Sequence, residues 1–451
     1  MNSLSNECAV IPEEFIPFSI GGPCCRYYRP AILISFRERY SFMVTLVDIR
    51  EAEARITGKV IRTPLVHSPT LSAMTGARVW LKLETLQRAG SFKVRGAVNR
   101  ILSSRETAEQ HGVVAASAGN HAQGVAVAAH AAGVPATIVM PEWASVTKQE
   151  ATRGYGAEIV IHGKSLEESI AKAEAMATEG RLFIHPFNDD EVIAGQGTIG
   201  LEILADLPET DVIVVPVGGG GLIAGITIAV KALRPQVSVI GVQAAACTSA
   251  SEALACRHPV LVEAQRTIAD GIRVAATGEK AFPVIRDLVD TIARVTEEEI
   301  ADAMLLLLER KHVVAEGAGA VPLAALLNKS FPVRAGSNVV LVISGGNIDS
   351  SLLFRIIRKA MIRQGRILRF SVLLDDQPGT LAHLLGVIAG TRGNILRIRH
   401  LQGEEGVPVQ MVRVSLELET RGKEHTAAIL RAAADAGYTV STEDGKSADS
   451  G

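Results

Sequence analysis

Short apolar runs alternate with amphipathic helical patterns from Val79 to Ile343. The runs are rich in β-branched residues and apolar at nearly every position, which is typical of parallel strands covered on both faces. The clearest runs are VVAAS, ATIVMP, AEIVIHG, DVIVVPV, VSVIGVQ and NVVLVIS. This pattern predicts an open, doubly wound α/β sheet divided into two lobes. Such sheets bind ligands at the carboxyl ends of their strands, so the turns that follow the runs are the candidate sites.

The pattern changes after Gly365. Residues 367–445 read strand, helix, strand, strand, helix, strand, which predicts a separate ferredoxin-like α+β module. Residues 446–451 are expected to form a disordered tail.

The first 42 residues show no sustained helical or alternating pattern. We expect this segment to be disordered or to reflect a wrongly chosen start. The folded chain is predicted to begin at about Met43, because Thr45 and Asp48 have the spacing of a helix-capping box with aspartate in place of Glu or Gln. The first domain then covers residues 43–366.

Composition narrows the functional classes. The 451 residues carry 46 basic and 48 acidic side chains, a net charge of -2, so the chain lacks the basic field that nucleic acid binding needs. The uncharged run from Val212 to Val230 contains Pro216 and four glycines, which predicts strand, turn and helix and not a membrane span. Five cysteines without a C-x-x-C pair indicate a reducing cytoplasm, with no disulfide framework or zinc site. We expect a cytoplasmic protein of two or three domains that binds neither nucleic acid nor membrane.

Four consecutive glycines connect a buried strand pattern to a helix start. They are Gly218, Gly219, Gly220 and Gly221. Without side chains, several backbone N–H groups can approach one anion at the positive end of the helix dipole. The glycines are therefore predicted to bind a phosphate group.

The glycine run has three other possible interpretations. The run fits the dinucleotide pattern G-x-G-x-x-A through Ala224, but the next strand ends in Gln243 where an acidic residue would bind the ribose. The lysine of a P-loop is missing, because Leu222 and Ile223 follow the glycines. A tight turn without a ligand stays an alternative, although four glycines have an ordering cost that a plain turn avoids.

Lys93 lies in a short turn between the strand pattern VWLKLE and a helix, and a single lysine is usually only a surface charge. Here the motif SFK-x-RGA around Lys93 occurs with the glycine run, with SAGNHAQG at residues 117–124 and with SGGN at residues 344–347. This combination resembles the fold-type II pyridoxal-phosphate (PLP) enzymes and, more closely, their threonine ammonia-lyase (threonine dehydratase) branch. The resemblance covers about Met43 to Gly365.

The resemblance implies a cofactor site around Phe92 and Lys93. Lys93 would hold PLP covalently, Asn120 would face the ring hydroxyl and Ser344 the pyridine nitrogen. An amine whose pKa is lowered by its site is both a nucleophile and a general base. The neutral hydroxyl of Ser344 cannot keep the ring nitrogen protonated, which weakens the electron sink and favours prompt β-elimination.

The SAGNHAQG turn precedes a helix, so its free N–H groups can bind a substrate carboxylate. The expected substrate-binding residues are Ser117, Ala118, Gly119, Asn120 and His121, although a structural role for His121 is as plausible as a catalytic one. Related serine racemases carry a second, proton-donating serine where Ala118 stands, so racemisation is disfavoured. No carboxylate follows Gln243 before Glu252, and we expect no metal ion where some relatives bind a divalent cation.

The C-terminal module resembles an ACT domain through LLDDQPGTLAHLLGVIAGTRGNI. Such modules usually pair and bind small amino acids at their interface, where N–H groups of the turn would bind the carboxylate of an effector. The expected effector residues are Asp375, Asp376, Pro378, Gly379 and Asn394.

Together these features predict a PLP-dependent lyase that deaminates L-threonine, and also L-serine, and is regulated through its ACT domain. It is expected to form a homo-oligomer, a dimer or a tetramer, and to respond to a small amino-acid or nucleotide effector. The alternatives are a serine or threonine racemase, another fold-type II PLP reaction, and a non-enzymatic amino-acid sensor. The sequence does not distinguish isoleucine biosynthesis from threonine catabolism.

Overall fold

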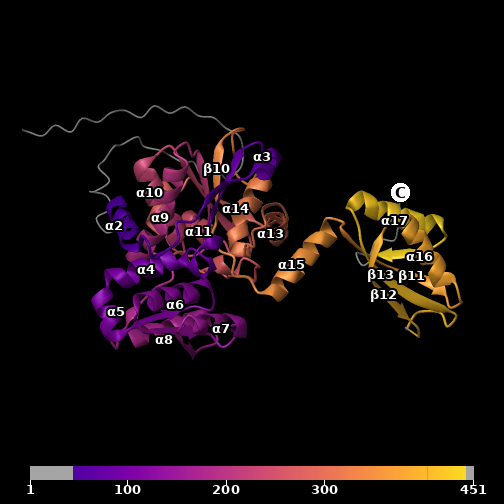
Figure 1. Cartoon of the computed structure of the whole chain (residues 1–451), viewed down its shortest axis with the longest axis horizontal. Coiled ribbons are helices and arrows are strands. Elements are labelled where there is room, and N and C mark those ends of the chain that lie inside the picture. Colours follow the sequence, from indigo (N-terminus) through magenta and orange to yellow (C-terminus); the bar gives the residue numbers. More distant parts are fainter. Residues whose placement is uncertain (1–43, 404, 443–451) are drawn as a thin grey trace, which may run out of the picture. The chain divides into compact units, whose positions relative to one another are not determined.

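The computed structural model describes residues 44–403 and 405–442, which form an α/β domain with two sheets and a C-terminal α+β module (Figure 1). The expectations for residues 1–42 and for the tail lie outside the described residues. Helix α2 (Leu46–Ile56) begins at the predicted capping box. The Asp48 backbone N–H donates to the Thr45 hydroxyl, and the Thr45 backbone N–H donates to the Asp48 carboxylate. This local prediction is confirmed.

The larger sheet has six strands in the order β1-β2-β10-β7-β8-β9, parallel except for β1. Its strands are β1 (Leu65–His67), β2 (Arg78–Leu83), β7 (Val212–Pro216), β8 (Ser238–Ala244), β9 (Thr291–Val295) and β10 (Asn338–Ile343). Helix α14 (Gly317–Leu327) shares a hydrophobic core with one face of this sheet. Helix α10 (Gly221–Leu233) covers the other face, where its Ile223 approaches Gly241 of β8.

The smaller sheet is wholly parallel, in the order β5-β4-β3-β6. Its strands are β3 (Val113–Ala116), β4 (Ala136–Met140), β5 (Glu158–Ile161) and β6 (Leu182–Phe183). Helix α6 (Asn120–Ala132) packs on one face and α8 (Leu166–Ala177) on the other. The remaining helices of the α/β domain are α3 (Pro69–Thr75), η1 (Glu84–Leu86), η2 (Arg88–Gly90), α4 (Lys93–Ser103), α5 (Arg105–His111), α7 (Val146–Gly154), α9 (Asp190–Asp206), α11 (Ser249–Cys256), η3 (Asp270–Ile272), α12 (Phe282–Leu288) and α13 (Glu297–Lys311).

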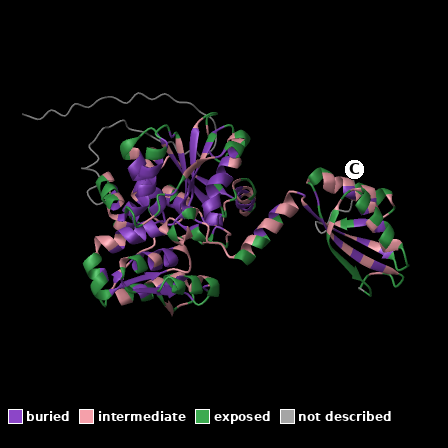
Figure 2. Cartoon of the chain, viewed as in Figure 1, coloured by how far each residue is buried: buried purple, intermediate pink, exposed green. Residues whose placement is uncertain are grey.

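All six apolar runs form strands, and every one except β5 is buried at nearly all of its positions (Figure 2). Strand β5 is exposed or half-buried along its length, because it forms an edge of the smaller sheet. The Val212 to Val230 run forms β7, a turn and most of α10, as predicted. Strands β1, β6 and β9 were not predicted, because β1 and β6 are very short and β9 is only partly buried. No helix in the described ranges is long and apolar enough to cross a membrane.

Helix α15 (Ser350–Arg363) leads into the C-terminal module. Its elements are β11 (Ile367–Asp375), α16 (Thr380–Gly390), β12 (Asn394–Leu401), β13 (Met411–Glu419), α17 (Lys423–Asp435) and β14 (Val440–Thr442), in the predicted order. The antiparallel sheet has the order β12-β13-β11-β14. Alternate residues of β11 and β13 share a core with α16 and α17, and this leaves the other face of the sheet open.

Helix α9 packs between α4 and α10, so closely that its backbone contacts the backbone of each. A Cβ atom at Gly195 of α9 would lie 2.7 Å from the Cα atom of Gly96 on α4. A Cβ atom at Gly225 of α10 would lie 2.3 Å from the carbonyl oxygen of Ile193 on α9. Only glycine permits these approaches, so direct backbone contact fixes the spacing of the three helices.

A buried network of four charged side chains holds α4 in place. Arg95 is fully buried and donates from Nε and Nη2 to the Glu84 carboxylate, at 2.8 Å each, and from Nη1 to Glu202, at 2.7 Å. Lys82 donates to Glu202 at 2.5 Å. Burial alone would raise the pKa of Glu84, but the Arg95 guanidinium outweighs this effect and lowers it. Two cations and two anions therefore neutralise one another inside the domain.

Removing one member of this network should be strongly destabilising. Arg95→Met leaves Glu84 and Glu202 facing Lys82 alone, and we expect the free energy of unfolding to fall by about 3–5 kcal/mol, since an uncompensated charge remains buried. Denaturant-induced unfolding followed by circular dichroism measures this. Arg105→Met removes an exposed partner of Glu109 and should cost less than about 1 kcal/mol. Equal losses in the two variants would contradict the role of the network.

Candidate active site

A cavity of ≈ 430 Å³ lies at the carboxyl ends of β3, β7 and β10. The structure brings all of the site residues predicted for the α/β domain together there. The predicted residues that line the cavity are Phe92, Lys93, Ser117, Ala118, Gly119, Asn120, His121, Gly218, Gly219, Gly220, Gly221 and Ser344. Residues more than 200 positions apart thus meet where an open α/β sheet binds its ligands.

Lys93 is the first residue of α4, and its amine reaches into the cavity. The Nζ atom donates to the carbonyl oxygen of Pro186 at 2.7 Å and lies 5.2 Å from the centre of the Phe92 ring. Burial lowers the pKa of Lys93 to about 8, although the nearby Glu316 opposes the shift. With this pKa roughly a tenth of the amine is neutral and nucleophilic at pH 7.

The glycine run forms the turn from β7 into α10. Gly220 is the N-cap of α10, with φ +94°, and no side chain caps the helix. A Cβ atom at Gly219 would lie 2.4 Å from the Phe187 ring. The turn therefore excludes side chains, and the first N–H groups of α10 lack a side-chain acceptor at the cavity wall. Such a helix N-terminus fits a phosphate group.

The turn after β3 provides a second helix N-terminus. Gly119 is the N-cap of α6, again without a side-chain cap, and its N–H donates to the Ser117 hydroxyl at 3.1 Å. His121 is buried, and its Nε2 atom lies 2.8 Å from the carbonyl oxygen of Ile184. Burial and the nearby Lys93 lower the pKa of His121 to about 3. The imidazole is therefore neutral, and its contacts favour the structural interpretation.

Glu316 was not predicted from the sequence. This buried residue lines the cavity, and its Oε1 atom accepts a hydrogen bond from Asn120 Nδ2 at 2.6 Å. Asn347 Nδ2 donates to Asn120 Oδ1 at 2.8 Å, so both ends of the Asn120 amide are held. Burial and the nearby Asp270 raise the pKa of Glu316 to about 8. The available sequence signal was a single acid at the start of the apolar helix pattern GAGAVPLAALL.

Ser344 follows β10 and is 2% exposed. Its carbonyl oxygen accepts from the Phe92 N–H at 3.1 Å, which connects the end of β10 to the residue before Lys93. Phe187 and the ion pair between Lys148 Nζ and Asp270 Oδ2, at 3.1 Å, were likewise not predicted from the sequence. All three residues line the cavity, but the ion pair joins segments far apart in the sequence and leaves no local pattern.

The donor set fits pyridoxal phosphate. The cofactor needs an amine for covalent attachment, an anion site for its phosphate and polar groups for its ring. Lys93, the N-terminus of α10, and Asn120 with Ser344 offer these in one cavity. The N-terminus of α6 remains for a substrate carboxylate.

The predicted effector residues do not all lie together. Gly379 is the N-cap of α16, with φ +100°, next to the end of β11. Asp375 pairs with Met411 at one end of β13, whereas Asn394 pairs with Glu419 at the other end. Eight residues of strand separate the two ends, about 27 Å. Within one chain Asn394 therefore lies away from the Asp375 to Gly379 turn, and the two could share an effector site only across a pair of modules.

Comparisons with known proteins agree with this donor set. The family described as "Pyridoxal-phosphate dependent enzyme" matches residues 56–345. The L-threonine ammonia-lyases of Thermotoga maritima and Geobacter sulfurreducens are each 47% identical over 399 residues, which is 88% of this chain and 99% of either relative.

Solved structures give the same result for the α/β domain. The solved T.th. threonine deaminase is 44% identical, with a TM-score of 0.64, over 68% of this chain and 99% of that protein. Maize serine racemase is 37% identical, with a TM-score of 0.67, over 72% of this chain and 100% of that protein. Given this extent of matching sequence, together with a lysine and an anion site in one cavity, the chain belongs to the pyridoxal-phosphate dependent enzymes and, within them, to the threonine ammonia-lyase family.

Proposed function

We propose that this cavity converts L-threonine to 2-oxobutanoate and ammonia, and L-serine to pyruvate and ammonia, by β-elimination. The observation that carries the proposal is that one cavity is lined by both Lys93 and the uncapped N-terminus of α10. Relatives named L-threonine ammonia-lyase match almost the whole of their own length. Family membership also removes the alternative of a non-enzymatic sensor.

Each part of the cavity has a role in this reaction. The N-terminus of α10 binds the cofactor phosphate, and the N-terminus of α6 binds the substrate carboxylate. When bound, pyridoxal phosphate supplies the sink for the electron pair left by the breaking Cα–H bond. Lys93 Nζ takes the α-proton, and this proton can be returned to the β-hydroxyl, which leaves as water. The released enamine tautomerises and is hydrolysed by water to the 2-oxo acid and ammonia. Glu316 and Asn347 keep the Asn120 amide oriented toward the ring position.

Elimination is proposed over racemisation because of the residue at position 118. Two-sided proton transfer needs a donor on the face of the substrate opposite Lys93. Ala118 lines the cavity with a methyl group, which has no proton to give. The structural similarity to maize serine racemase shows that the same architecture occurs in proteins named for either reaction.

The C-terminal module is proposed to be an ACT domain that binds a small amino acid at the turn containing Asp375, Asp376, Pro378 and Gly379. Free N–H groups at the start of α16, which has no side-chain cap, support carboxylate binding there. Pairing of these modules would make the enzyme a homo-oligomer. We also propose a cytoplasmic location, because Cys247 and Cys256 are both free thiols.

The lowered pKa of Lys93 predicts how cofactor attachment depends on pH. With the pKa lowered to about 8, the neutral fraction of the amine reaches one half at pH 8 and levels off about one pH unit higher. The rate at which cofactor-free enzyme takes up pyridoxal phosphate should follow this curve, measured by the absorbance of the bound form. Lys93→Ala should abolish attachment and reduce turnover at least about 10²–10⁴-fold.

Lys164→Ala is the matched control, since Lys164 is exposed at the same cavity and has no assigned role. This variant should keep both attachment and turnover. The assignment is wrong if borohydride reduction and peptide mapping place the pyridoxyl group on a lysine other than Lys93.

Ala118→Ser should raise the formation of D-serine from L-serine, because the new hydroxyl provides the missing proton donor. The unsubstituted enzyme should form pyruvate with little D-serine. Chiral chromatography beside a pyruvate assay measures both products. Ala118→Val adds bulk without an acidic proton and should not raise D-serine. Comparable D-serine from the unsubstituted enzyme would refute the preference for elimination.

Removing residues 367–451 should leave threonine cleavage but abolish any response to amino acids. Initial rates with L-isoleucine, L-valine and AMP test this. Gly379→Val in the full chain is a second variant, because a β-branched residue at φ +100° distorts only the turn before α16. An absent response in the unsubstituted enzyme, or an equal response after truncation, would overturn the regulatory role.

A further inference from the structure

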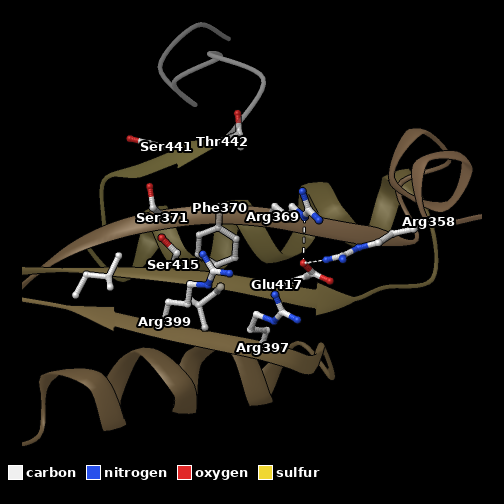
Figure 3. Close-up of a pocket in the computed structure, with 12 residues that line it drawn as sticks. Arg358, Arg369, Phe370, Ser371, Arg397, Arg399, Ser415, Glu417, Ser441 and Thr442 are labelled. Atoms are coloured by element: carbon white, nitrogen blue, oxygen red, sulfur yellow. Dashed lines mark hydrogen bonds and ion pairs between the residues drawn. The ribbon is translucent and has the colours of Figure 1, made fainter. Parts of the chain in front are cut away.

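The open face of the C-terminal sheet carries a hollow of ≈ 340 Å³ that the proposed function does not use (Figure 3). Its polar lining residues are Arg358, Arg369, Ser371, Arg397, Arg399, Ser415, Glu417, Ser441 and Thr442. All lie on β11–β14 except Arg358, which extends from α15. The hollow lies over the middle of the strands, away from the turn that precedes α16.

One row across the four strands explains why the face is hollow. Arg399 of β12 pairs with Ser415 of β13, which pairs with Ser371 of β11, which pairs with Ser441 of β14. One arginine is thus followed by three serines in register. Serine is not among the residues that favour strands by packing, and its small side chain leaves space above the sheet. The row offers hydroxyl donors instead of a packing surface.

The neighbouring row is cationic. Arg397 pairs in register with Glu417, which pairs with Arg369. The Glu417 carboxylate accepts from Arg358 and from Arg369 Nε, the latter at 3.1 Å. Within residues 44–403 and 405–442, the side chains of Arg397 and Arg399 make neither an ion pair nor a hydrogen bond, and both are exposed. The described residues that line the hollow therefore include one carboxylate and four guanidinium groups.

This charge balance determines what can cover the face. Like charges side by side on a sheet are destabilising, so the excess positive charge favours an anion from solution. A second copy of the same face would bring another four arginines and is electrostatically disfavoured. A guanidinium group can donate two parallel hydrogen bonds to two oxygens of one phosphate, and hydroxyl groups can donate to the remaining oxygens. We propose that the open face of the C-terminal sheet binds a small molecule through a phosphate group held by Arg397, Arg399 and the serine row.

Binding to the full-length enzyme loaded with pyridoxal phosphate tests the proposal, since the active-site phosphate position is then filled. Isothermal titration in a phosphate-free buffer uses inorganic phosphate, AMP and adenosine as probes. Replacing both exposed arginines by Arg397→Gln and Arg399→Gln should weaken phosphate-compound binding at least about 10-fold, because charge-assisted hydrogen bonds are lost. The affinity of the unsubstituted enzyme should fall as salt rises.

A double variant of the same charge, Arg431→Gln with Arg421→Gln, is the matched control, because both residues are exposed and lie outside the hollow. It should bind like the unsubstituted enzyme, and basal threonine cleavage should be unchanged in all these variants. If phosphate and AMP bind with equal affinity, the site recognises the phosphate group alone. If AMP binds more tightly, the site recognises a phosphate ester. The proposal fails if neither phosphate compound binds, if adenosine binds as well as AMP, or if the hollow variants bind normally. Each of these results leaves the deamination test untouched.

Discussion

The position of the reactive amine depends on a buried ion network two residues further along its helix. Arg95 follows Lys93 on α4 and binds Glu84, after β2, and Glu202, on α9. Lys82 completes the neutral set. Since a buried charge is tolerated only with its partners in place, the network admits one position of α4 relative to the sheet. The start of α4, and with it Lys93, is thereby directed into the cavity before any cofactor binds.

Much of the fold was predictable from local patterns. Long apolar runs identified the buried strands, and Thr45 with Asp48 identified the start of α2. The glycine run and Lys93 were also found, because each has an unusual composition within a few residues. Glu316 and Phe187 were missed, since their importance arises only when distant segments meet in the cavity. The separation of Asn394 from the Asp375 turn within one chain was not predictable, because proximity in the sequence does not show at which end of the sheet β12 begins.

The two parts of the chain distribute polar groups differently. In the α/β domain the polar groups of the site lie in turns at the ends of strands that are buried at almost every position. In the C-terminal module β11 and β13 alternate, and their polar positions form the open face (Figure 2). The period of burial along a strand therefore indicates where a ligand can approach: at strand ends where both faces are covered, and over the strand centres where one face is open.

The glycine contacts of α9 bear on how such an enzyme changes during evolution. Because α4 carries Lys93 and α10 begins at the phosphate turn, the α9 backbone acts as a fixed spacer between the two ends of the cofactor site. The closest of these glycine contacts join backbone atoms only. Substitutions in the surrounding core therefore leave the spacing of the three helices almost unchanged. Selection for a different reaction can then act on single atoms in the turns, such as the methyl group of Ala118. A rigid helical core and variable turns together allow new chemistry without a new cofactor site.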